Sequence, residues 1–281
     1  VWIGYLLYKL AGNESKSINT ITWLWLLNPY VIQISAVWGQ FDAFCALFAV
    51  TSIYLLLKER TSLSAMFLSV GALTKLVPIL FLVPILIYLS KRCGLRFAIK
   101  YFAVFSITMG LILSSFLLFP NGLETMMYWI FPYKGLSPNI LGSTRIDGLT
   151  WMVLFNTLGW EVNFLAFPLI FGPLYLLFNY LFWRGQGDFN SLIKLLATTL
   201  LLFTLSYTAI TPQLVLIGLP FLLYLVLKER FSKKLFVILS VVPLIYIYGV
   251  FNPLQFVSPV IVWNEWVYPP WSDVINYIWP K

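Results

Sequence analysis

Long apolar runs constrain this chain more than any other feature of its sequence. Hydrophobic residues make up 60% of its 281 residues and charged residues only 10%, whereas a soluble domain averages about 25% charged residues. A helix needs about 20 apolar residues to cross a bilayer. The sequence predicts an all-α, polytopic transmembrane helical bundle, with spans at residues 1–10, 20–38, 41–57, 101–119, 163–183, 191–210, 213–227 and 235–251.

Residues 1–281 are expected to form a single transmembrane domain. The chain begins with Val1 inside an apolar segment, without an initiator methionine or a signal-peptide pattern. Two interpretations account for this start. The favoured one is a fragment that lacks an N-terminal helix and a first outer loop, and the other is a processed chain.

Loop charges predict the orientation, because cytoplasmic loops carry an excess of Lys and Arg. This distribution accounts for the formal charge of +8, so no nucleic-acid partner is expected. We expect a multi-pass protein among membrane lipids, in the plasma membrane of a prokaryote or in the endoplasmic reticulum. The residues predicted to face the cytoplasm are Lys9, Lys16, Lys58, Arg60, Lys91, Arg92, Arg96, Lys100, Arg184, Lys194, Lys228, Arg230, Lys233 and Lys234.

Residues 62–90 are too many for one upright helix and too few for two complete ones. A single crossing would place Lys91, Arg92 and Arg96 outside, against the charge rule. We therefore expect a short re-entrant hairpin with its apex near Lys75 and Pro78, on the outer side. One long tilted helix is the alternative. The outer segments 120–150 and 252–281 are rich in aromatic residues and are expected to contain interfacial helices.

Polar residues gather near the predicted outer boundary. Gln40 and Asp42 flank a turn, and a carboxylate at the edge of the hydrocarbon must face a polar cavity or a partner. Asp42 would then line a substrate cavity with Gln40, or it would cap a helix that begins at Ala43. Lys75 is a cation within a long apolar stretch, so it would meet an anion such as phosphate or extend to a lipid headgroup.

Three further positions carry weaker signals. Arg145 and Asp147 would form a local ion pair, or Arg145 would contact a phosphate. Gln213 follows a tight turn and would face the same cavity. Asn28 precedes Pro29, which breaks the predicted span 20–38 and frees a carbonyl that Asn28 could help to satisfy. The alternative for this pair is a simple packing kink.

The residue types present exclude several kinds of site. The chain contains no His, and its two cysteines, Cys45 and Cys93, have neither a disulfide pattern nor a metal-binding spacing. No cofactor is identified, and the need for a divalent cation is left open. Any proton acceptor must be a carboxylate or another base.

Three segments together resemble the polytopic GT-C glycosyltransferases. They read NPYVIQISAVWGQFDAFCALFAVTSIYLLLKER, GALTKLVPILFLVPIL and YTAITPQLVLIGLPFLLYL, and they are similar to mannosyltransferases related to the catalytic subunit of GPI mannosyltransferase I and to its prokaryotic relatives. The resemblance implies transfer of a sugar, mannose, from a polyprenyl- or dolichyl-phosphate donor to a glycan or glycolipid acceptor. Transfer would occur at the outer or lumenal face, with inversion.

The resemblance also implies roles for individual residues. A carboxylate would take the proton of the acceptor hydroxyl, and the principal catalytic Asp is expected in the first outer loop, upstream of Val1. Among the positions present, Asp42 is the catalytic candidate. Lys75 would hold the lipid phosphate, and the other substrate-binding candidates are Gln40, Arg145, Asp147 and Gln213.

Two other functional classes fit the same pattern. Broken helices and a buried Lys also suit a transporter or a lipid flippase, although no inverted repeat is visible in the sequence. A non-catalytic subunit of a glycan-assembly pathway is the other alternative.

Overall fold

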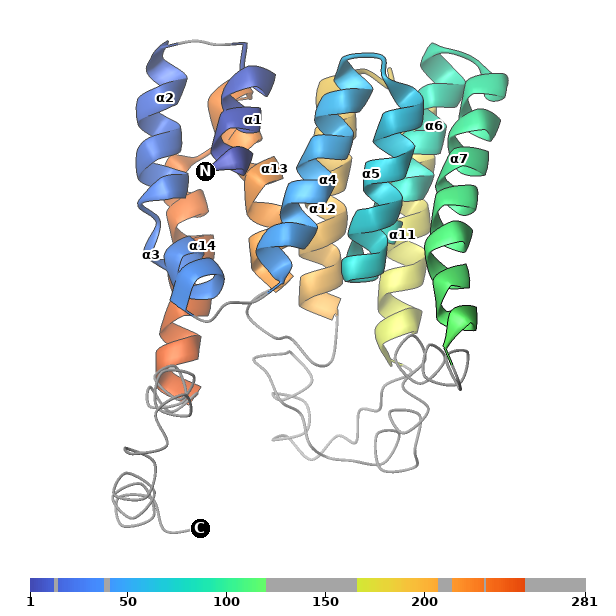
Figure 1. Cartoon of the computed structure of the whole chain (residues 1–281). Coiled ribbons are helices and arrows are strands. Elements are labelled where there is room, and N and C mark those ends of the chain that lie inside the picture. The colour runs from blue at the N-terminus through green and yellow to red at the C-terminus, as the bar shows by residue number, and fades with distance from the viewer. Residues whose placement is uncertain (13–14, 38–40, 120–165, 207–213, 230, 251–281) are drawn as a thin grey trace.

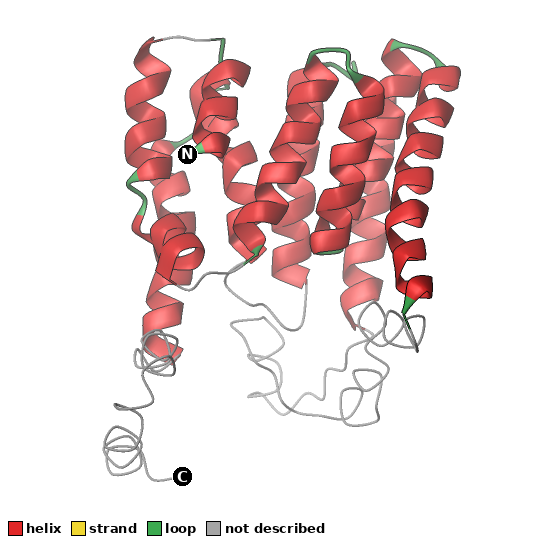
Figure 2. Cartoon of the chain, viewed as in Figure 1, coloured by secondary structure: helices red, strands yellow, loops and turns green. Residues whose placement is uncertain are grey.

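A computed structural model describes residues 1–12, 15–37, 41–119, 166–206, 214–229 and 231–250 of the chain (Figure 1). These residues form helices and the loops between them, and no strand occurs in this part of the chain (Figure 2). The prediction of an all-α fold is therefore confirmed. The interfacial helices predicted within residues 120–150 and 252–281 lie outside the described ranges.

The helices form a bundle in which most axes run along one direction (Figure 1). The elements in chain order are α1 (Trp2–Leu10), α2 (Ser15–Ile21), the π-helix η1 (Thr22–Leu26), α3 (Pro29–Ile32), the π-helix η2 (Gln33–Val37), α4 (Asp42–Leu57), α5 (Thr61–Thr74), the 3-10 helix η3 (Val77–Phe81), α6 (Leu82–Arg92), α7 (Leu95–Ser114), the 3-10 helix η4 (Ser115–Leu118), α11 (Ala166–Arg184), α12 (Phe189–Ser206), α13 (Leu214–Lys228) and α14 (Lys233–Val250).

Helix α13 lies at the centre of the bundle. It packs against α1, α4, α12 and α14, and its side chains are buried almost without interruption from Leu214 to Val226. A helix that is apolar on every side must be enclosed by protein or by lipid. Its neighbours show that α13 is enclosed by protein.

The outer helices instead expose large apolar side chains. On α7, Ile99, Ile107 and Leu111 are more than half exposed, and α11 and α14 show similar residues. Two helices, Leu95–Leu118 and Phe189–Ser206, are long and apolar enough to cross a membrane by length and composition. The other described helices do not meet this test, and α4, α5 and α13 are shorter apolar helices of 10–17 residues.

The break predicted at Pro29 within the span 20–38 is confirmed. Helical structure stops at Leu26 and resumes at Pro29, because Pro29 has no amide hydrogen to continue the ladder. The Asn28 side chain compensates for the break. Its Nδ2 donates to the carbonyl of Leu24 at 3.1 Å and to Oγ of Ser240 in α14 at 3.0 Å, while its Oδ1 accepts from the Tyr30 amide at 2.9 Å. Asn28 thus supplies the partner that the sequence predicted.

The hairpin predicted for residues 62–90 is confirmed as a chain reversal. Helix α5 ends at Thr74, and η3 and α6 then return toward the end of the bundle where α5 began (Figure 1). The alternative of one long tilted helix is therefore wrong. Both legs pack against α7, and α6 also contacts α11 and α12.

Among the described residues, basic side chains gather at one end of the bundle. The α4–α5 loop carries Lys58 and Arg60, and the last turn of α6 carries Lys91 and Arg92 (Figure 1). At this end the Lys91 ammonium donates to the carbonyl of Trp183 at 2.6 Å and to that of Gly185, which satisfies acceptors at the end of α11. Lys75 lies at the opposite end, together with the first residue of α4.

Replacing Asn28 by Ala is expected to lower the free energy of unfolding by about 1–3 kcal/mol, because buried backbone and side-chain groups lose their partners. The thermal midpoint in detergent measures the loss. Ser240→Ala is the matched control, since it removes one partner and leaves the bond from Asn28 to Leu24. Equal stability of Asn28→Ala and the wild type would contradict this account of the break.

Candidate functional site

Asp42 is placed by the start of α4. The N-cap position is Phe41, whose side chain makes no capping hydrogen bond. Asp42 follows in the first turn, where the amides of a helix terminus favour a negative charge. Its side chain is only 3% exposed. An ionised carboxylate at this depth needs a partner to offset the loss of water.

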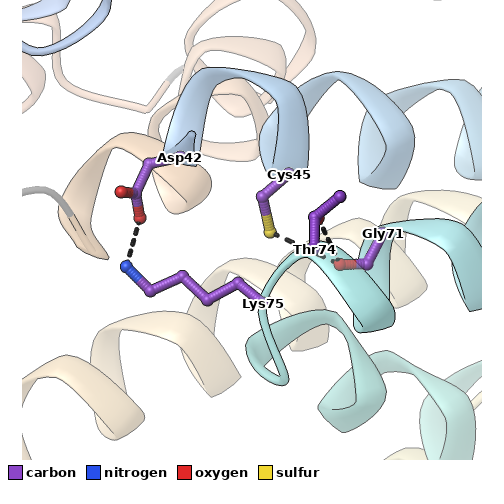
Figure 3. Close-up of polar contacts among 5 residues, drawn as sticks. All are labelled: Asp42, Cys45, Gly71, Thr74 and Lys75. Atoms are coloured by element: carbon purple, nitrogen blue, oxygen red, sulfur yellow. Dashed lines mark hydrogen bonds and ion pairs between the residues drawn. The ribbon is translucent and has the colours of Figure 1, made fainter. Parts of the chain in front are cut away.

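Lys75 provides that partner. Its Nζ lies 2.6 Å from Oδ1 of Asp42, and the bond joins α4 to the apex of the α5–α6 hairpin (Figure 3). Lys75 has extended backbone angles at the C-cap of α5, so its side chain leaves the helix and reaches across to α4. The alternative in which Asp42 caps a helix that begins at Ala43 is wrong, because α4 begins at Asp42 itself and Phe41 is its N-cap.

The two members of this ion pair differ in access. The Lys75 side chain is 31% exposed, ten times the fraction for Asp42. An ammonium group has three donors, and Asp42 accepts from one of them. Among the described residues Asp42 is the partner of this ammonium, so donors remain for a ligand, while the balancing carboxylate is buried.

A close approach between α4 and α5 sets the geometry behind the pair. A Cβ on Gly71 would lie 3.1 Å from Cβ of Phe48 and 3.7 Å from the amide nitrogen of Ala49. The Gly71 carbonyl accepts from the Thr74 hydroxyl at 2.7 Å, and Sγ of Cys45 lies 3.9 Å from the same carbonyl oxygen (Figure 3). These contacts hold the last turn of α5 against α4, one turn away from Lys75.

Sequence reasoning identified Asp42 and Lys75 but not the residues that support them. Gly71, Thr74 and Cys45 carry no chemical motif, although a run of small residues before Lys75 is a signal for close helix packing. The other candidates, Gln40, Arg145, Asp147 and Gln213, lie outside the described residues. Within the described ranges, no three residues among His, Cys, Asp and Glu gather into a group that could hold a metal ion.

Comparisons with known proteins give the chain its relatives. The family model for glycosyltransferase family 87 matches residues 1–212. GPI mannosyltransferase 1 of Schizosaccharomyces pombe is 25% identical over 131 residues, which cover 46% of this chain and 35% of that protein. GPI mannosyltransferase 1 of Candida albicans is 32% identical over 93 residues, which cover 32% of this chain and 23% of that protein. No solved structure matches the chain.

The contact at Gly71 predicts a difference between two glycines. Gly71→Ala is expected to lower the free energy of unfolding by about 1–3 kcal/mol, because the added methyl group overpacks the α4–α5 contact. Gly110→Ala on α7 is the matched control, since a Cβ there meets nothing within 4 Å, and it should be neutral or slightly stabilising. Thermal midpoints in detergent compare the two, and equal effects would refute the tight contact.

Proposed function

Because this chain belongs to glycosyltransferase family 87, we propose that it takes part in transferring a sugar, mannose, from a polyprenyl- or dolichyl-phosphate donor to a glycan or glycolipid acceptor. The family match carries this proposal, and it spans both members of the Asp42–Lys75 pair. The likeness to two GPI mannosyltransferases supports mannose as the sugar.

The surface of the bundle supports a multi-pass location in a membrane. A water-soluble protein rarely exposes large contiguous apolar patches, whereas α7, α11 and α14 carry many exposed large apolar side chains. The charges at the Lys58 and Lys91 end favour the cytoplasmic side for that end. The Asp42–Lys75 end then faces the outer or lumenal side, in the plasma membrane of a prokaryote or in the endoplasmic reticulum.

Lys75 is proposed to hold the phosphate of the lipid donor. Its side chain is partly exposed at the end of the bundle, and among the described residues Asp42 is the partner of its ammonium, which leaves donors for a phosphate. Negative charge increases on the phosphate as the bond to the sugar breaks. A fixed cation stabilises that developing charge more than it stabilises the bound donor, which lowers the barrier.

Asp42 is proposed to fix the ammonium in place. Its carboxylate is buried and bonded to Lys75. It therefore holds the cation at the hairpin apex without taking the ammonium donors that would bind the phosphate. The sequence also made Asp42 a candidate base, and that role stays a prediction, because it needs the ion pair to open during the reaction.

The proposed transfer is a single displacement at the anomeric carbon. The acceptor hydroxyl oxygen forms the new bond, and the bond between the anomeric carbon and the phosphate oxygen breaks with its electron pair leaving on the phosphate. The hydroxyl proton passes to a carboxylate base. Attack from the face opposite the phosphate inverts the configuration. Gln40, Arg145, Asp147 and Gln213 are proposed as further substrate-binding residues.

Exchanging the ion pair for neutral amides tests the phosphate role. Lys75→Ala alone would leave Asp42 buried without its partner, which costs about 3–5 kcal/mol in typical cases. The double variant Asp42→Asn/Lys75→Gln removes both charges and keeps similar side-chain volumes. It is expected to lower the rate of mannose transfer from a dolichyl-phosphate donor at least 100-fold, while the amount of folded protein stays close to that of the wild type.

Asp42→Asn alone is the matched control for this experiment. It keeps the ammonium and loses only the fixing carboxylate, so a smaller fall of about 5–30-fold is expected, equivalent to about 1–2 kcal/mol at the transition state. Wild-type transfer rates in the double variant would reject the role of Lys75. Absence of transfer by the full-length wild-type protein, with any segment upstream of Val1 included, from any prenyl-phosphate sugar would reject the enzyme and favour a non-catalytic subunit or a transporter.

A further inference from the structure

A backbone carbonyl where the 3-10 helix η3 meets α6 cannot make the α-helical bond that would follow it. Pro84 follows Leu80 by four residues, and proline has no amide hydrogen. The usual helical bond from residue 84 to the Leu80 carbonyl therefore cannot form. The α-type donor of this carbonyl is thus missing, and a side-chain donor can take its place.

Tyr175 of α11 supplies the donor. Its hydroxyl donates to the Leu80 carbonyl at 2.8 Å, across a separation of 95 residues in sequence. The ring is held by stacking on Phe171, with centroids 5.3 Å apart and planes inclined by 17°. The Asn179 side chain donates to the Tyr175 carbonyl at 2.8 Å. The hydroxyl is thus presented from a side chain with little freedom to move.

The anchored carbonyl lies five residues after Lys75. The intervening segment is η3, in which Val77, Pro78 and Phe81 are buried. Phe81 packs edge-on against Phe221 of α13, with centroids 5.1 Å apart. A displacement of Leu80 would therefore be transmitted through a short, packed turn to the hairpin apex.

We infer that Tyr175 is a positioning residue, whose bond to the Leu80 carbonyl keeps the Lys75 ammonium on Asp42. The hairpin apex is then held from both legs, by the Gly71 contact on the α5 side and by Tyr175 on the α6 side. The consequence for catalysis rests on the proposed function, whereas the effect on the position of Lys75 does not.

Chemical modification of Lys75 tests the inference without an activity assay. The full chain in detergent is treated with a sulfonated N-hydroxysuccinimide ester of acetate, and acetylation of Lys75 is followed by mass spectrometry. The reagent attacks the neutral amine, so the ion pair protects it. Tyr175→Phe keeps the ring and removes the hydroxyl, and it is expected to speed Lys75 acetylation about threefold to tenfold, the range for a lost hydrogen bond.

Two variants make the result specific. Tyr180→Phe removes a hydroxyl from the same helix, where it is exposed and accepts from Arg184, and it should leave Lys75 acetylation unchanged. Pro84→Ala restores an amide hydrogen four residues after Leu80. In that background Tyr175→Phe should have little further effect, because the carbonyl has a second donor and the two changes are coupled.

Each outcome decides the inference. Equal rates of Lys75 acetylation in Tyr175→Phe and the wild type would overturn it. An effect of Tyr175→Phe that is as large in the Pro84→Ala background as in the protein that keeps Pro84 would overturn it too. In a transfer assay, Tyr175→Phe should lower kcat and leave the KM for the acceptor unchanged. If the full-length wild-type protein, with any segment upstream of Val1 included, transfers no sugar, the proposed function fails, and the acetylation rates still decide the role of Tyr175.

Discussion

Groups that lose their usual hydrogen-bond partner inside an apolar bundle must find another, and this constraint organises the described structure. Pro29 interrupts a helix, and Asn28 joins the break to α14. Pro84 withholds a donor from Leu80, and Tyr175 joins that carbonyl to α11. The Asp42 carboxylate forms an ion pair with Lys75. In each case a side chain satisfies a local defect or charge, and a bond to a second segment joins parts of the bundle.

Much of this architecture could be predicted from the sequence. Apolar length and the near absence of charge indicated helices only, and loop charges indicated that residues 62–90 turn back on themselves. The break at Asn28 and Pro29 followed from the chemistry of proline. For residues 20–38 the proline was needed to foresee the break, because hydropathy reports the environment of a segment and says little about the continuity of its backbone.

The candidate site was only half predictable, because its key contacts join residues distant in sequence. A charge in an apolar run signals that Asp42 or Lys75 needs a partner, but composition gives no means to pair two residues 33 positions apart. The bond from Tyr175 to Leu80 is even harder to predict from the sequence, since tyrosine is common throughout this chain. The spacing at Gly71 depends on how two helices meet, which the periodicity of either helix alone does not determine.

The enclosure of α13 has a consequence for how this sequence can vary. Both α7 and α13 are apolar helices, yet α7 turns bulky side chains outward while α13 is surrounded by other helices. An exchange of one large aliphatic residue for another along the outer face of α7 should therefore have little effect on stability. The same exchange in α13 meets fixed neighbours on every side. Side-chain volume, rather than hydrophobicity, therefore limits which residues evolution can accept there.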